Sequence, residues 1–105
     1  MTLHDTKIIT INLITGELVE TKIPTKVLDP DKVGVKTSEI SKEVLEEKNI
    51  AISFSKMTDG RAYSLAAKIK EIADGIEIHA IGKINQEICY FLKRSGFDIA
   101  HFASS

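Results

Sequence analysis

From residue 33 onward the sequence alternates between short apolar runs and longer segments of helical periodicity. Four runs have the length of strands, at 33–35 (VGV), 49–54 (NIAISF), 76–82 (IEIHAIG) and 97–102 (FDIAHF). The segments between them, near 38–48, 63–73 and 84–95, carry apolar residues at helical spacing. Such alternation is typical of parallel strands joined by right-handed helical crossovers. We therefore predict an α/β fold with a small, mainly parallel sheet and the order β-α-β-α-β-α-β.

The N-terminal part of the chain follows a different pattern. Two β-rich runs flank a turn at 15–16, and their apolar or β-branched residues alternate with a period of two at Ile9, Ile11, Leu13, Val19, Thr21 and Ile23. This pattern predicts an antiparallel β-hairpin with one buried face, which extends or caps the sheet. Two prolines interrupt both periods between residues 24 and 32, which predicts a connection. We expect one compact domain, with the hairpin and connection in 1–32 and the α/β region in 33–105.

The composition is that of a globular protein and argues against several functional classes. Hydrophobic residues make up 43% and charged residues 28% of the 105 residues, which is enough for a packed core. Fourteen basic and fifteen acidic residues give a net charge of −1. Because binding to nucleic acid or to an anionic membrane usually needs a basic excess, we expect neither partner. The sequence shows no secretory signal and no apolar stretch of roughly 20 residues, which predicts a soluble, cytoplasmic protein.

The sequence contains no fingerprint of a cofactor. It has no CxxC pair and no HExxH, P-loop or GxGxxG motif, so we expect no metal, nucleotide or other cofactor. The single cysteine, Cys89, cannot form an internal disulfide. Its position in the middle of a predicted helix, beside Ile88, indicates a small core residue rather than a reactive thiol.

A polar turn between a predicted strand and a predicted helix is the first candidate site. Asp59, Gly60 and Arg61 lie beyond the carboxyl end of strand 49–54, where open α/β sheets bind their ligands. Amides at the N-terminus of the next helix attract anions, Gly60 lets the backbone approach a ligand, and Arg61 offers a planar guanidinium. These features predict an anion-binding site.

The same turn also has an architectural interpretation, which spacing alone favours. Thr58 or Asp59 would cap the helix, Gly60 would relieve the turn, and Arg61 would pair with a neighbouring acid. In the binding interpretation the hydroxyl groups of Thr58, Tyr63 and Ser64 would add contacts to the anion.

A histidine in a predicted strand is the second candidate. His79 shares a face with Glu77 and Ile81, opposite Ile78, and approaches the carboxyl end of strand 76–82. If this strand neighbours strand 49–54, His79 would lie near the turn and would bind an anion or move a proton. The alternative is a half-buried histidine whose hydrogen bonds are satisfied within the fold. His101 has a similar but weaker case.

Several motifs occur in a fixed order between residues 33 and 102. They are a strand with phenylalanine, the DGR turn with a serine three positions further on, a strand that ends in glycine, and a closing GFD, carried by Phe54, Asp59, Gly60, Arg61, Tyr63, Ser64, Ala80, Gly82, Arg94, Gly96, Phe97 and Asp98. In order and spacing they resemble the DUF934 family of small bacterial proteins. The chain departs from the family pattern at His79 and Ser95, where arginine and cysteine are usual. It also departs in 82–88 (GKINQEI), which lacks an arginine and an aspartate of that pattern.

The resemblance implies a link to sulfur chemistry. Members of this family are commonly labelled as oxidoreductases of sulfite reduction, a label of gene context beside sulfite reductase. Sulfite and sulfate are oxyanions of the kind that a helix terminus and Arg61 would hold. We therefore expect an accessory or small-oxyanion-binding protein linked to sulfite metabolism. In it Arg61 anchors the anion, Asp59 orients Arg61, and Ser64 or His79 makes a second contact.

A non-catalytic interaction module is the alternative. Such a module would dock a larger metabolic enzyme through the edge of the sheet or through strand 97–102. The sequence leaves open whether the chain is an enzyme, because a redox enzyme acting alone would need a cofactor fingerprint.

Overall fold

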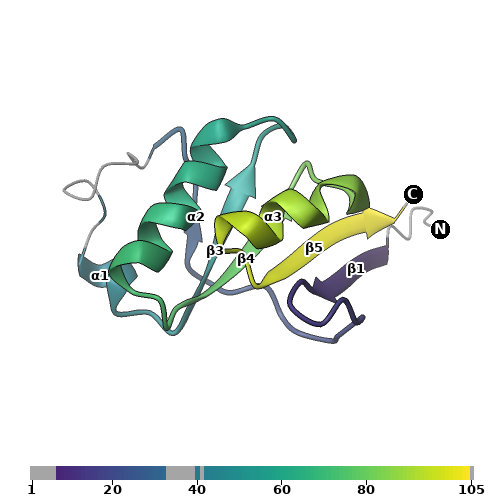
Figure 1. The fold of residues 1–105 in the computed structure, drawn as a ribbon, viewed down its shortest axis with the longest axis horizontal. Coiled ribbons are helices and arrows are strands. Elements are labelled where there is room, and N and C mark those ends of the chain that lie inside the picture. Colours follow the sequence, from purple (N-terminus) through teal and green to yellow (C-terminus); the bar gives the residue numbers. More distant parts are fainter. Residues whose placement is uncertain (1–6, 33–39, 41, 105) are drawn as a thin grey trace.

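A five-stranded sheet with helices packed against it forms the body of the protein (Figure 1). The computed structural model describes residues 7–32, 40 and 42–104. Its elements are β1 (Lys7–Asn12), β2 (Val27–Leu28), α1 (Lys42–Leu45), β3 (Asn49–Phe54), α2 (Gly60–Ile72), β4 (Glu77–Gly82), the short 3-10 turn η2 (Gln86–Ile88), α3 (Cys89–Ser95) and β5 (Ile99–Ser104). The strand order is β1-β5-β4-β3-β2. The α/β class is confirmed.

The sheet is mixed rather than strictly parallel. Strands β2, β3, β4 and β5 run parallel to one another. Strand β1 pairs antiparallel with β5 along its whole length and forms one edge. The N-terminal strand therefore extends the sheet, and strands β3 and β4 are adjacent as the His79 prediction required.

Helices α2 and α3 lie on the same face of the sheet, which carries the apolar core (Figure 1). Alternate residues of β3, Ile50, Ile52 and Phe54, are buried in this core. Leu65 and Ile69 of α2 are fully buried members of the same cluster. Helix α2 begins at Gly60, three residues before the predicted start at residue 63, because the side chain of the preceding residue caps it.

The opposite face of the sheet, here called the second face, is covered by the chain between β1 and β2. Because these strands lie at opposite edges, residues 13–26 have to cross from one edge to the other. Residues 19–23 line a cavity together with Thr10 and His101 of the second face. His79, on the same face of β4, has no exposed surface. This crossing segment closes the second face without a helix.

The predicted N-terminal hairpin is present only next to its turn, where the Asn12 amide donates to the Glu17 carbonyl at 2.9 Å. After β1 the chain turns back, and Ile11 forms an isolated bridge with Leu18, but residues 19–23 form no strand. Pairing with β1 ends at Val19, whose amide donates to the Thr10 carbonyl at 3.0 Å, and residues 20–23 then line a cavity with Thr10 and His101 of the second face. The predicted connection at 24–32 contains a strand, β2, which pairs with β3.

Two other predictions concern residues near α1. The predicted strand at 33–35 and the start of the helix near 38–48 lie outside the described residues, and α1 accounts for Lys42–Leu45 of that helix. Among the described residues, no helix combines the length and the apolar character that crossing a membrane requires.

Candidate functional site

Asp59 holds the start of α2. Its Oδ1 accepts a hydrogen bond from the Arg61 amide at 3.1 Å, the geometry of a helix N-cap. Its Oδ2 lies 3.5 Å from the Ser55 hydroxyl, which is a weak hydrogen bond. The residue is only 4% exposed. The predicted capping role of Asp59 is confirmed.

Gly60 and Arg61 form the exposed part of the turn. A methyl group on Gly60 would meet no atom within 4 Å, and Gly60 has no positive φ, so the turn does not require glycine. Because Gly60 has no side chain, it does not cover the N-terminus of α2. The Arg61 guanidinium pairs with Asp31, and its Nε lies 3.7 Å from Asp59 Oδ1. The pairing that the architectural interpretation predicted for Arg61 therefore exists, at an arginine side chain that is 56% exposed.

A surface depression of about 450 Å³ follows the start of α2. We call it the turn depression, and it is lined by Lys56, Thr58, Asp59, Gly60, Arg61 and Ser64. It brings together four of the six predicted site residues, all except Tyr63 and His79. Lys56 was missed by the sequence analysis, although it adjoins the turn and adds a second cation.

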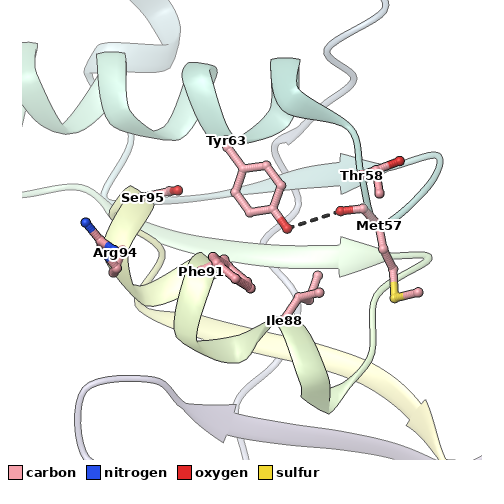
Figure 2. A pocket seen from close by; sticks show the side chains of 7 residues that line it. All are labelled: Met57, Thr58, Tyr63, Ile88, Phe91, Arg94 and Ser95. Carbon is pink, nitrogen blue, oxygen red and sulfur yellow. Dashed lines mark hydrogen bonds between the residues drawn. The ribbon is translucent and has the colours of Figure 1, made fainter.

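Tyr63 belongs to a different cavity. Its ring packs edge-to-face on Phe54 at 5.2 Å between centroids, and its hydroxyl donates to the Met57 carbonyl at 3.1 Å. Burial raises the pKa of this phenol. Figure 2 shows the ring above Phe91 and Ile88, on the side of α2 that faces α3.

This interhelical cavity has a volume of about 540 Å³. It is lined by Met57, Thr58, Tyr63, Ile88, Phe91, Arg94 and Ser95 (Figure 2). Motif spacing does not predict this cavity, because its walls come from two segments that each have an ordinary composition. Cys89 lies beside it in the chain, half-buried, and burial raises the pKa of its thiol, as expected for a packing residue.

His79 does not lie near the turn. It pairs with Ala51 in the middle of β3, whereas the turn follows Phe54, which pairs with Gly82. Its side chain is fully buried on the second face, away from the helices. The expectation that His79 contacts the anion at the turn is therefore not supported by the geometry. Strand periodicity gave the correct face but not the distance along the strand.

His79 instead belongs to a hydrogen-bonded chain across three strands. Its Nε2 lies 2.7 Å from Glu77 Oε1, and its Nδ1 lies 2.7 Å from His101 Nε2. The planes of the two rings differ by 11°, their centroids are 5.0 Å apart, and His101 Nδ1 lies 3.0 Å from the Thr10 hydroxyl. We call these four residues the histidine network. It matches the alternative prediction of a histidine satisfied within the fold.

The carboxylate of Glu77, at one end of the network, indicates which ring nitrogen atoms carry protons. A carboxylate oxygen only accepts, so His79 Nε2 carries the proton that Glu77 receives. When both imidazoles are neutral, His79 Nδ1 accepts from His101 Nε2, and His101 Nδ1 accepts from the Thr10 hydroxyl. Burial, with repulsion from His79 added, lowers the pKa of His101 to about 4. The neutral form of His101 is therefore the one that the fold holds at neutral pH.

The predicted docking strand 97–102 lies mostly inside the sheet. Residues 99–102 belong to β5, which lies between β4 and β1. Phe97 and Phe102 are 1% and 5% exposed. Among the described residues, no group of three or more His, Cys, Asp and Glu side chains is arranged to hold a metal ion.

The comparisons with known proteins identify the family. The family described as "Bacterial protein of unknown function (DUF934)" matches residues 29–105. A search of curated proteins and a search of solved structures each found no match. The matched region contains the turn depression, the interhelical cavity and three members of the histidine network. The chain belongs to the DUF934 family of bacterial proteins.

Proposed function

We propose that this protein is an accessory protein that binds a small oxyanion in the turn depression. The observation that carries the proposal is the convergence of two cations, Lys56 and Arg61, with the Ser64 hydroxyl and the exposed Gly60 amide on one depression. The first amides of a helix have no partner within the helix and carry a partial positive charge. An oxyanion would meet both kinds of donor there.

The ion pair between Arg61 and Asp31 does not oppose this binding strongly. Their side chains are 56% and 50% exposed, and exposed pairs of this kind contribute about 0–1 kcal/mol. An oxyanion bound to the guanidinium would replace Asp31 as its partner. Asp59 would stay in place, because its carboxylate accepts from the Arg61 amide and holds the start of the helix.

Sulfite and sulfate are the ligands to test first. This choice follows from the resemblance to proteins labelled for sulfite reduction, and it agrees with the tetrahedral or pyramidal oxyanions that helix termini bind. The proposal assigns binding and no reaction. A cytoplasmic location and a larger metabolic enzyme as partner belong to the same proposal.

Titration followed by proton–nitrogen correlation spectra tests the proposal. Sulfite, sulfate and phosphate are added separately to labelled protein, and we expect saturable shifts of the amides from Gly60 to Ser64 at millimolar ligand. Arg61→Gln should remove these shifts. Lys68→Gln is the matched control, because Lys68 lies on the same helix and does not line the depression.

The thermal stability of the variants separates binding from architecture. The free energy of unfolding of Arg61→Gln should lie within about 1 kcal/mol of that of the original protein, because the ion pair that it loses is exposed. A lack of shifts for every oxyanion at millimolar concentration would refute the proposal. So would a large loss of stability in Arg61→Gln with unchanged shifts.

A further inference from the structure

The interhelical cavity leaves large apolar side chains open to solvent. Phe91 is 56% exposed and Met57 is 38% exposed, and both line the cavity together with Ile88 and the ring of Tyr63. Figure 2 shows Tyr63 on one side and Phe91 and Ile88 on the other. A ligand between them would remove this apolar surface from water, which is favourable in proportion to the area buried. The walls therefore suit a ligand with an apolar body.

The volume agrees with a small ligand. The cavity measures about 540 Å³, and ligand pockets in proteins span roughly 300–1,000 Å³. Such pockets typically combine apolar walls with a few polar groups that fix the orientation of the ligand. The Thr58 and Ser95 hydroxyls and the Arg94 guanidinium are the polar groups here.

Arg94 gives the cavity a charge at one end. The side chain comes from the last turn of α3, beside Ser95 (Figure 2). Among the described residues, no carboxylate lies within ion-pairing distance of its guanidinium, and the guanidinium carbon lies 5.7 Å from the centroid of the Tyr90 ring. An arginine without a counter-ion at the end of an apolar cavity favours a ligand that brings the anion itself.

Tyr63 keeps the middle of the cavity neutral. Its hydroxyl already donates to the Met57 carbonyl, and its pKa is raised by burial, so the phenol stays protonated at neutral pH. A ligand with charge along its whole length would therefore find a partner only at the Arg94 end.

We propose that the interhelical cavity binds a small amphipathic anion, such as an aryl or alkyl carboxylate or sulfonate. The apolar body lies between Tyr63 and Phe91, and the charged group pairs with Arg94. This site is separate from the turn depression. Helix α2 presents Tyr63 to the cavity and Arg61 to the depression, and Thr58 is the residue common to both. Because Arg61 lines only the depression and Arg94 lines only the cavity, separate variants test the two proposals.

Two fluorescent probes of nearly equal shape test the proposal. Anilinonaphthalene sulfonate has an aromatic body and one negative charge, and N-phenylnaphthylamine has the same body without the charge. We expect saturable one-to-one binding of both probes to the folded protein, with tighter binding of the sulfonate. Alkyl and aryl carboxylates should displace the sulfonate probe, and neutral amides of the same acids should displace it less.

Three variants separate charge from shape. Arg94→Gln should weaken binding of the sulfonate probe by about tenfold and leave binding of the neutral probe unchanged, because it removes a charge-assisted hydrogen bond. Phe91→Ala should weaken both probes. Lys93→Gln is the matched control, because Lys93 is an exposed cation on the same turn that does not line the cavity. It should leave both probes unchanged.

The location of the probe and the state of the protein complete the test. The amide resonances of residues 88–95 should shift when the probe binds, while the Gly60 amide resonance should not change. Each variant should unfold cooperatively, because loosely packed states bind the sulfonate probe without a site. An equal loss of affinity for the sulfonate probe in Arg94→Gln and Lys93→Gln would overturn the proposal. An absence of saturable binding would also overturn it, as would binding of the probe only to partly unfolded protein.

Discussion

Acidification should destabilise this protein through His101, whose side chain is buried on the second face of the sheet. The residue is 3% exposed, and its Nδ1 accepts a hydrogen bond from Thr10. Burial and repulsion from His79 lower its pKa from 6.5 to about 4. The unfolded chain titrates near the ordinary value. Between these two values the unfolded state binds more protons than the folded state, so stability falls as the pH falls.

The size of the effect follows from the two pKa values. The stabilising contribution of neutral His101 is fully present above about pH 6.5 and is lost as the pH falls toward 4. A difference from 6.5 to about 4 corresponds to at most about 3 kcal/mol. About 2 kcal/mol of this is lost between about pH 7.5 and about pH 5. Domains have a total stability of roughly 5–15 kcal/mol, so the loss is measurable.

Other titratable groups near His101 also contribute to the pH dependence of stability. Glu77 reaches it through His79, and Glu20 and Lys22 of the crossing segment line the same cavity as His101. These groups remain in a His101→Gln variant, which keeps an amide donor toward His79 but does not titrate. The difference between the two proteins therefore gives the contribution of His101 together with its coupling to His79.

Urea unfolding at a series of pH values measures that difference. The original protein should lose about 2 kcal/mol more than His101→Gln between about pH 7.5 and about pH 5. Thr10→Val removes a hydrogen-bond partner but no titrating group, so it should keep the pH dependence of the original protein. A nuclear magnetic resonance titration of the imidazole gives the pKa directly. A value near 6.5 in the folded state, or equal pH dependence in the original protein and His101→Gln, would refute the reasoning.

Two further predictions concern residues that hold strands together. Gly82→Ala should cost roughly 2–4 kcal/mol in thermal unfolding, since φ is +100° and a methyl group would lie 2.5 Å from the Phe54 carbonyl oxygen. Gly75→Ala, where a methyl group meets nothing within 4 Å, should change stability by less than about 1 kcal/mol; equal effects would contradict the steric argument. Asp98→Ala should cost about 2–3 kcal/mol in urea unfolding, because it leaves the buried Ile78 amide without its acceptor at 2.9 Å. Asp98→Asn should recover part of that loss, and no recovery would argue against the hydrogen bond as the cause.

The parts of the fold that sequence reasoning found are those with a strong local period. The strand at 49–54 is reproduced without change as β3, and β4 differs from its predicted range by one residue. Strand β2 has two residues, too few to show any alternation, and was read as a connection. The run at 19–23 alternates like a strand, but residues 20–23 are exposed and belong to no strand, and alternation alone does not distinguish such a segment from a paired strand.

The two candidate sites also differ in how far the sequence predicts them. The turn depression was found because most of its residues are contiguous in the sequence and follow a strand end. The interhelical cavity joins Met57 and Tyr63 to residues 88–95, and neither segment alone has an unusual composition. Its existence depends on how closely α2 and α3 pack, which periodicity does not specify.

The two faces of the sheet keep ligand binding and acid sensitivity apart. Tyr63 and Arg61 lie on α2, on the helical face, whereas His101 lies on the second face under the crossing segment. Above about pH 6.5, His101 is neutral in both the folded and the unfolded protein, so changes in pH there do not act on binding through the stability of the fold. Binding measured near pH 7.5 therefore reports on the two sites alone. A loss of binding at about pH 5 that His101→Gln restores would be a loss of folded protein rather than a change in either site.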